Sequence, residues 1–186
     1  MNVLITILSR INRINLEVCR IAVIALCAAI VVIVAASVFF RYVLNDSLSW
    51  AEELSKFCML WLVFVGSPIA LRVGNHIAIE MLPGALPERA GALLRAAVMG
   101  LVMTFLVVLL WKSWGFAVNG WTQTAIAIGD VSMFWIFVSI PVGAASMLLV
   151  ALQLLLEEFS RVLGGTPPVD PFIARYGSEL SGQAGE

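Results

Sequence analysis

Four apolar runs, separated by polar segments, dominate the chain. They predict membrane-spanning helices at about residues 21–40, 50–71, 93–114 and 131–156. The first run holds twenty residues without a charge. At about 1.5 Å of rise per residue, this length matches a hydrocarbon core roughly 30 Å thick. The last run holds twenty-six uncharged residues, enough to cross the bilayer with a tilt. The pattern therefore predicts an all-α integral membrane protein with four transmembrane helices.

Residues 1–20, before the first span, alternate in polarity at helical spacing. Ser9, Arg10, Asn12 and Arg13 lie opposite an apolar face formed by Leu4, Leu8, Ile11, Ile14 and Val18. This pattern is typical of a short amphipathic helix in the membrane interface. A signal peptide is the competing interpretation, because three arginines precede the first apolar run. That run is longer than the roughly 7–15 apolar residues of a signal sequence, so we expect it to stay as a transmembrane helix.

A polar turn over residues 40–61 connects the first two spans. Ser49 and Glu52 have the spacing of a capping box, in which each side chain bonds the backbone N–H of the other residue. The second helix is therefore predicted to begin at Trp50. Glu52 and Lys56 lie one helical turn apart in the favourable order and are expected to pair.

Prolines and small residues predict how the spans bend and pack. Pro68 removes a backbone donor, so we expect a kink in the second helix, and Pro141 beside Gly143 predicts a bend in the fourth. Ala92, Ala96 and Gly100 form a row of small residues that would let two helices approach closely in lipid. Ordinary alanine-rich composition explains this row equally well.

The connections divide the chain into three parts. Residues 1–20 form the interfacial segment, residues 21–161 the four-helix membrane domain, and residues 162–186 a polar tail expected to be disordered. Residues 72–95 carry Gly and Pro signals and predict a loop. Residues 113–130 fit either an interfacial loop or a short helix that places Trp114 and Trp121 at the interface.

Lysine and arginine are distributed unequally between the two predicted membrane sides. Eight lie in the N-terminal segment, the central loop and the tail, and three lie on the opposite side. An excess of basic residues marks the cytoplasmic side. Both termini are therefore predicted to be cytoplasmic. The three on the opposite side are Arg41, Lys56 and Lys112.

Composition excludes a soluble globule. Hydrophobic residues make up 61% of the chain and charged residues 12%, against about 25% charged in soluble chains. The net charge of −1 gives no basic field for nucleic acid. The three cysteines are scattered without metal-binding or disulfide spacing.

No catalytic motif is apparent in the sequence, and we predict neither enzymatic activity nor a cofactor. His76 and Glu80 could form an acid–base pair if their segment were helical, although a loop histidine with a local hydrogen bond is the simpler interpretation. Acidic and basic residues all lie within a turn or two of the ends of the predicted spans. A chain that moves a charged solute by itself normally has polar groups at mid-depth. Arg41 could bind an anionic substrate, but a snorkelling arginine is the commoner case.

The second helix carries a stripe that fits contact with a larger membrane partner. Packing within the four-helix unit is the alternative for each residue. The stripe comprises Trp50, Glu53, Phe57, Leu60, Trp61 and Phe64.

Three stretches resemble the small membrane subunit of tripartite ATP-independent periplasmic (TRAP) transporters, the DctQ-like family. They are FRYVLNDSLSWAEEL, ALRVGNHIAIEMLPGALPER and the IPVG of the fourth span, and the resemblance covers residues 21–159. Two departures stand out. Glu80 replaces a more usual aspartate, and residues 123–130 lack the Thr/Ser-Pro that often precedes the fourth helix.

The resemblance implies a scaffold subunit, in the bacterial inner membrane, of a sodium-coupled transporter that imports organic acids. A large DctM-like permease subunit would move the solute, and a periplasmic DctP-like binding protein would deliver it. Arg41, Trp50, Glu52 and Glu53 then form a periplasmic motif, and Arg72 and His76 a cytoplasmic one. With Phe57 and Trp61, they are expected to position helices and contact partners.

Two other classes compete with this interpretation. A stand-alone four-helix exporter that works as an oligomer would need a membrane-embedded acidic residue, and residues 21–40 contain none. A haem or quinone subunit would need histidine ligands within the spans, and the one histidine lies outside them.

Overall fold

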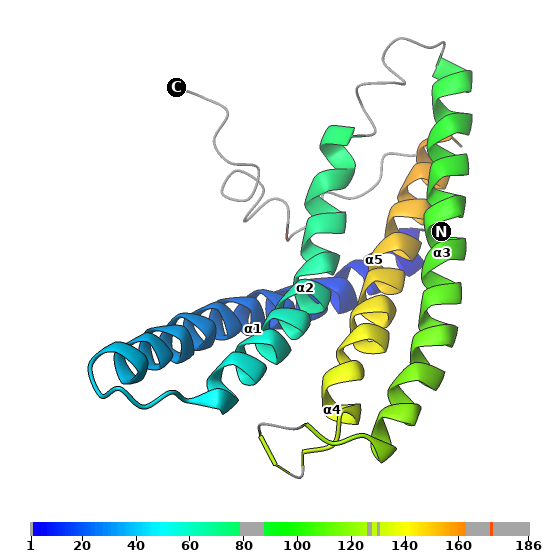
Figure 1. Cartoon of the computed structure of the whole chain (residues 1–186). Coiled ribbons are helices and arrows are strands. Elements are labelled where there is room, and N and C mark those ends of the chain that lie inside the picture. The colour runs from blue at the N-terminus through cyan, green and yellow to red at the C-terminus, as the bar shows by residue number, and fades with distance from the viewer. Residues whose placement is uncertain (1, 79–87, 126–127, 130, 163–171, 173–186) are drawn as a thin grey trace, which may run out of the picture.

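The computed structural model describes residues 2–78, 88–125, 128–129, 131–162 and 172. Its helices are α1 (Asn2–Tyr42), α2 (Ser49–Ala78), α3 (Glu88–Asn119), the 3-10 turn η2 (Gly120–Thr122), α4 (Phe134–Phe137) and α5 (Ser139–Val162) (Figure 1). Four helical segments are long and apolar enough to cross a membrane: Ile5–Tyr42, Ser49–Val73, Ala97–Thr122 and Phe134–Glu157. The predicted all-α fold with four spans is confirmed.

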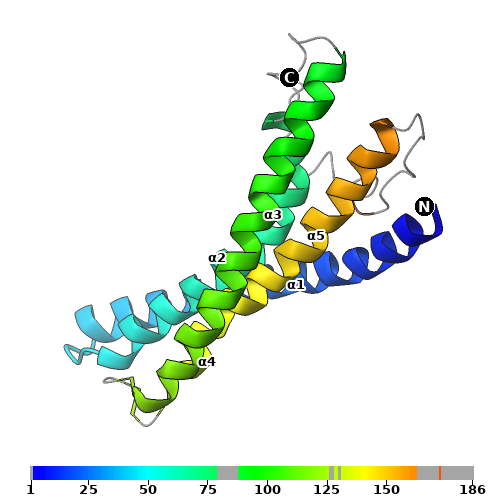
Figure 2. The same cartoon turned by 90° about the vertical axis from the view of Figure 1, so that its right-hand side faces the viewer.

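Helix α1 joins two segments that the sequence pattern separated. The predicted interfacial helix and the first span form one continuous helix of 41 residues. At about 1.5 Å per residue it is roughly 60 Å long, twice the thickness of a hydrocarbon core. α1 runs across the other helices instead of parallel to them, and its N-terminal half reaches the C-terminal half of α5 (Figures 1 and 2).

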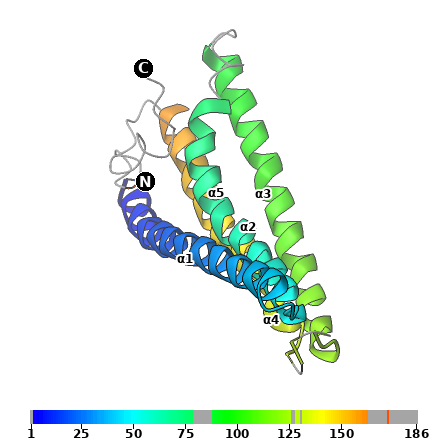
Figure 3. The ribbon, with the colours of Figure 1, turned by 60° about the vertical axis from the view of Figure 1, so that its left-hand side comes forward.

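Helices α2 and α5 form the middle of the molecule. α1 packs on one side of this pair and α3 on the other (Figure 3), and the backbones of α1 and α3 stay apart within the described residues, although Leu16 of α1 and Met99 of α3 belong to one apolar cluster. Apolar burial is concentrated on α5, whose Val150 and Ala151 are fully buried. The bundle is therefore organised around α5, although α1 is the longest helix.

Helices α2 and α5 approach each other closely where Gly143 of α5 lies against the backbone of Phe64 in α2. Pro68 is buried in α2 and has no N–H, so the Phe64 carbonyl one turn earlier receives no helical hydrogen bond from it. Gly143 of α5 lies against this carbonyl, since a Cβ at Gly143 would stand 2.5 Å from the Phe64 oxygen. Only a residue without a side chain fits this crossing.

The predicted loop over residues 72–95 is too long. Helix α2 continues to Ala78 and α3 already begins at Glu88, so both ends of that segment are helical. In the row of small residues, a Cβ added at Gly100 would meet no atom of the described residues within 4 Å, so Gly100 makes no close helix contact in that part of the chain.

The stretch before the fourth span is a helix end followed by a loop. α3 extends to Asn119 and not only to residue 114, and the loop after η2 closes through a bridge between Thr124 and Ser132. The fourth span is interrupted at Val138, between α4 and α5. Pro141 explains the interruption, because the Phe137 carbonyl has no proline N–H to bond. The interruption lies where a bend in this span was predicted.

One residue of the predicted disordered tail is part of the core. Phe172 is 1% exposed and packs with Leu16, Met99, Val150 and Leu154. The prediction of a wholly disordered tail is wrong at this position, since a large aromatic side chain gains by leaving water for the apolar cluster.

Candidate functional site

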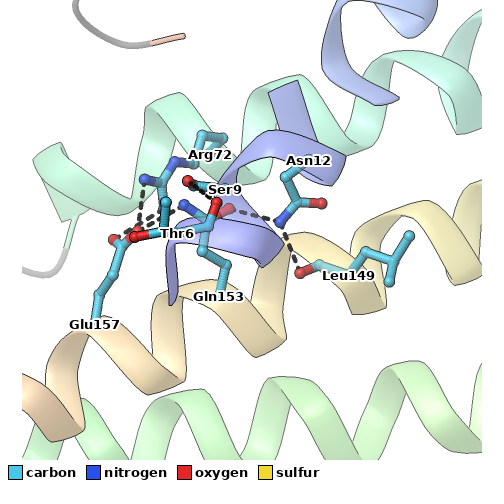
Figure 4. Close-up of polar contacts among 7 residues, drawn as sticks. All are labelled: Thr6, Ser9, Asn12, Arg72, Leu149, Gln153 and Glu157. Carbon is cyan, nitrogen blue, oxygen red and sulfur yellow. Dashed lines mark hydrogen bonds and ion pairs between the residues drawn. The ribbon is translucent and has the colours of Figure 1, made fainter. Parts of the chain in front are cut away.

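A buried ion pair connects α2 to α5. The Arg72 guanidinium donates from Nη1 to Oε2 of Glu157 at 3.1 Å and from Nη2 to Oε1 at 3.0 Å (Figure 4). The side chains of Arg72 and Glu157 are only 2% and 10% exposed. Two parallel bonds between a planar guanidinium and a carboxylate fix both distance and orientation. Arg72 lies next to the end of the α2 span, Ser49–Val73, and it is buried there because Glu157 provides its counter-charge.

Two amide side chains extend the ion pair to α1. Gln153 Nε2 donates to Glu157 Oε1 at 2.7 Å, and Asn12 Nδ2 donates to Gln153 Oε1 at 2.7 Å. The same Asn12 nitrogen also lies 2.9 Å from the Leu149 carbonyl oxygen. We call Asn12, Arg72, Gln153 and Glu157 the polar clamp. It joins three helices that are far apart in the sequence (Figure 4).

Local sequence explains how the clamp residues meet. Gln153 and Glu157 are four residues apart and therefore lie on one face of α5. Ser9 and Asn12 of the predicted polar face of α1 are buried, whereas Arg10 and Arg13 of the same face are exposed. The opposite face points outward, with Ile14 63% exposed and Ile11 48% exposed. The buried face of the N-terminal half of α1 therefore combines the polar residues Ser9 and Asn12 with the apolar residues Ile5 and Leu16.

The turn between α1 and α2 holds a second, exposed ion pair. Arg41 Nη2 lies 2.9 Å from Glu52 Oε1, with side chains 52% and 58% exposed. Two residues of the predicted motif are thereby brought together. The predicted capping box is wrong: α2 begins at Ser49, and no hydrogen bond joins Ser49 to Glu52 among the described residues. The predicted Glu52–Lys56 pair is also wrong, because Glu52 pairs with Arg41.

The contact stripe of α2 is partly used inside the chain. Trp61 Nε1 donates to the Trp135 carbonyl at 3.2 Å and so connects α2 to α4. Glu53 and Phe57 are half-buried, whereas Trp50 is 42% exposed. The stripe therefore contributes both to internal packing and to the outer surface.

The motif predicted to be cytoplasmic, Arg72 with His76, is described only in part. Arg72 belongs to the polar clamp, and His76 lies in the last turns of α2. The side chain of His76 and residue Glu80 lie outside the described part of the chain. The suggested His76–Glu80 pair therefore stays a prediction.

Sequence reasoning missed Asn12, Gln153 and Glu157 as site residues. One signal was present, because Gln153 is the single amide side chain in the uncharged run 131–156. A polar residue inside a membrane span needs a partner. Its neighbour one turn later, Glu157, directly follows that uncharged run. No group of three metal-binding side chains occurs within the residues that the structure describes.

These observations define a class: a four-helix, multi-pass membrane protein whose buried polar side chains fasten its own helices together. The family described as "Tripartite ATP-independent periplasmic transporters, DctQ component" matches residues 30–161. The chain belongs to this family, and it is a multi-pass protein of the bacterial inner membrane.

Curated relatives support the assignment. The chain is 25% identical over 185 residues to the C4-dicarboxylate TRAP transporter small permease protein DctQ of Vibrio cholerae, covering 85% of this chain and 79% of the relative. It is 26% identical over 150 residues to the sialic acid TRAP transporter small permease protein SiaQ of the same species, covering 81% and 85%. It is also 31% identical over 121 residues to the sialic acid TRAP transporter permease protein SiaT of Haemophilus influenzae, covering 64% of this chain and 19% of that protein.

Proposed function

We propose that this chain is the small scaffold subunit of a sodium-coupled TRAP transporter that imports organic acids. A large permease subunit moves the solute, a periplasmic binding protein delivers it, and the chain itself has no enzymatic activity. Both of its termini lie in the cytoplasm, in agreement with the distribution of lysine and arginine.

The polar clamp is the observation that carries the scaffold role. Its four side chains bond one another and fix α1, α2 and α5 in one arrangement. Breaking a buried ion pair leaves an uncompensated charge and costs about 3–5 kcal/mol. Helices fastened in this way resist relative movement, which suits a subunit that stays fixed while its partner moves.

The match to SiaT supports association with a large permease. That relative is named a permease, and the matched part is only 19% of its length. A segment of this kind is therefore covalently joined there to a longer permease chain. The uncovered apolar surface of α1 and α3, including Val31, Leu101 and Phe105, provides room for such a partner.

Co-purification tests the proposed assembly. The chain is co-expressed with its large permease subunit, and the tagged small subunit is recovered in mild detergent. Trp50→Ala and Glu53→Ala are expected to lower the recovery of the permease, while Lys112→Ala on α3 serves as a surface control. Recovery at the wild-type level for both α2 variants, with normal uptake, would contradict the proposed contact.

Reconstituted uptake tests the coupling. Proteoliposomes holding both membrane subunits and the binding protein are expected to accumulate an organic acid only with an inward sodium gradient. Omission of the small subunit should abolish uptake. Transport by the small subunit alone would refute the scaffold role and favour the stand-alone exporter.

A further inference from the structure

The N-terminal half of α1 has an exposed apolar surface that none of the functions above uses. It consists of Ile7, Ile11, Ile14 and Val18, whose exposed fractions lie between 48% and 63%. These residues follow one another at spacings of four, three and four positions, so they lie along one side of the helix. We call these four residues the outer strip.

Two arginines without a counter-charge lie beside the outer strip. Arg10 precedes Ile14 by four residues and Arg13 follows Arg10 by three, so the three side chains are neighbours on the helix surface. Both arginines are exposed, and neither has an ion pair or hydrogen bond within the described residues. The nearby acidic residue, Glu17, pairs with Arg20. One edge of the strip therefore carries two uncompensated positive charges.

The length of α1 limits how the helix can lie in a membrane. Its 41 residues are roughly 60 Å long, whereas a bilayer with its headgroup regions is about 40–45 Å thick. An upright α1 would place the outer strip in water, which is unfavourable for apolar side chains. A tilt of roughly 45° keeps the whole helix within the bilayer and its headgroups. In agreement with such a tilt, α1 runs across the other helices (Figures 1 and 2).

The outer strip continues into the apolar surface of the first span. Ile21 and Ile24 are 65% and 57% exposed, and they open the uncharged run 21–40. Lipid acyl chains that surround this run therefore reach the strip without a break. A water-soluble partner would cover the strip but not its continuation.

We propose that the N-terminal half of α1 lies in the membrane interface, with the outer strip among acyl chains and Arg10 and Arg13 on the phosphates of anionic phospholipids. A guanidinium can bind a phosphate through two parallel hydrogen bonds. Amphipathic helices with arginine beside an apolar face bind anionic membranes in this way. The proposal does not depend on the transporter role.

Photocrosslinking of the full-length chain tests which molecules cover the strip. The photoreactive amino acid p-benzoylphenylalanine replaces Ile14, and the chain is reconstituted in nanodiscs of equal phosphatidylglycerol and phosphatidylcholine. Mass spectrometry then identifies the adducts. We expect lipid adducts in which phosphatidylglycerol is enriched over phosphatidylcholine. The same probe in place of Val32, an exposed residue of the uncharged run, should give lipid adducts without a headgroup preference.

Two double variants test the arginines with the probe at position 14. Arg10→Gln with Arg13→Gln should lower the enrichment of phosphatidylglycerol about fivefold for each arginine, the effect of one basic residue near an anionic surface. Lys56→Gln with Lys112→Gln removes the same charge from exposed side chains of α2 and α3, and it should leave the enrichment unchanged.

Several results would overturn the proposal. Absence of lipid adducts at position 14 would place the strip in water. An adduct with a second copy, or with the permease in the co-purified complex, would show that protein covers the strip. Equal labelling of the two lipids, the same headgroup preference at positions 14 and 32, or equal effects of the two double variants would exclude the role of the arginines.

Discussion

Removing one partner of the Arg72–Glu157 pair should cost far more stability than removing both. Arg72→Met leaves a buried carboxylate whose remaining described partner is the Gln153 amide. Glu157→Leu leaves a buried guanidinium. An uncompensated buried charge costs about 3–5 kcal/mol, a large part of a typical folding free energy of about 5–15 kcal/mol. In the double variant both charges are gone, so we expect a free energy of unfolding within about 2 kcal/mol of the wild type.

The assay measures the free energy of unfolding in mixed micelles for four proteins: the wild type, the two single variants and the double variant. Circular dichroism monitors unfolding as the fraction of denaturing detergent increases. The expected coupling energy is about 4 kcal/mol or more, because the two single costs do not add. Arg41→Met, which breaks the exposed pair with Glu52, is the matched control and should cost about 0–1 kcal/mol. Single variants as stable as this control, or single costs that add up in the double variant, would refute the reasoning.

Three further substitutions test the packing, each by the free energy of unfolding in the same assay. Gly143→Ala should cost at least about 2 kcal/mol, because its Cβ would meet the α2 backbone, whereas Gly100→Ala should be neutral or stabilise by up to about 1 kcal/mol. A neutral Gly143→Ala would show that the helices can separate freely. Trp61→Phe should cost about 1 kcal/mol for the lost bond to the α4 backbone, and an unchanged value would exclude that bond. Phe172→Ala should cost about 3 kcal/mol and make the C-terminus more sensitive to protease; wild-type behaviour in both would contradict its burial.

Hydropathy predicted the four spans well, because a long uncharged run in a membrane protein has few stable structures other than a transmembrane helix. It failed at the ends of the spans, where polar residues stop the apolar pattern but do not stop the helix. Arg72 ended the predicted second helix, yet α2 continues to Ala78, since Glu157 satisfies the arginine within the bundle. That partner is 85 residues away in the sequence, so no local pattern contains it.

The turn before α2 shows the same limit on a smaller scale. Ser49 and Glu52 have the spacing of a capping box, and Glu52 and Lys56 have the spacing of a helical ion pair. Neither the capping box nor the Glu52–Lys56 pair forms, because α1 places Arg41 next to Glu52 and the two side chains pair. Sequence spacing shows which bonds a side chain can make to its neighbours along the chain. Whether one of these bonds or a bond to a distant residue forms depends on the tertiary fold.

The predicted polar face of α1 is divided in the structure, because Ser9 and Asn12 are buried whereas Arg10 and Arg13 are exposed. In water, burial of the apolar face would be favourable and the polar face would stay outside. In lipid, apolar side chains gain little from packing against a protein, whereas an amide without a partner costs free energy. Asn12 therefore turns inward to Gln153, and Ile14 on the opposite face stays exposed. The same reasoning explains why polar contacts hold together three helices of a chain that is 61% hydrophobic.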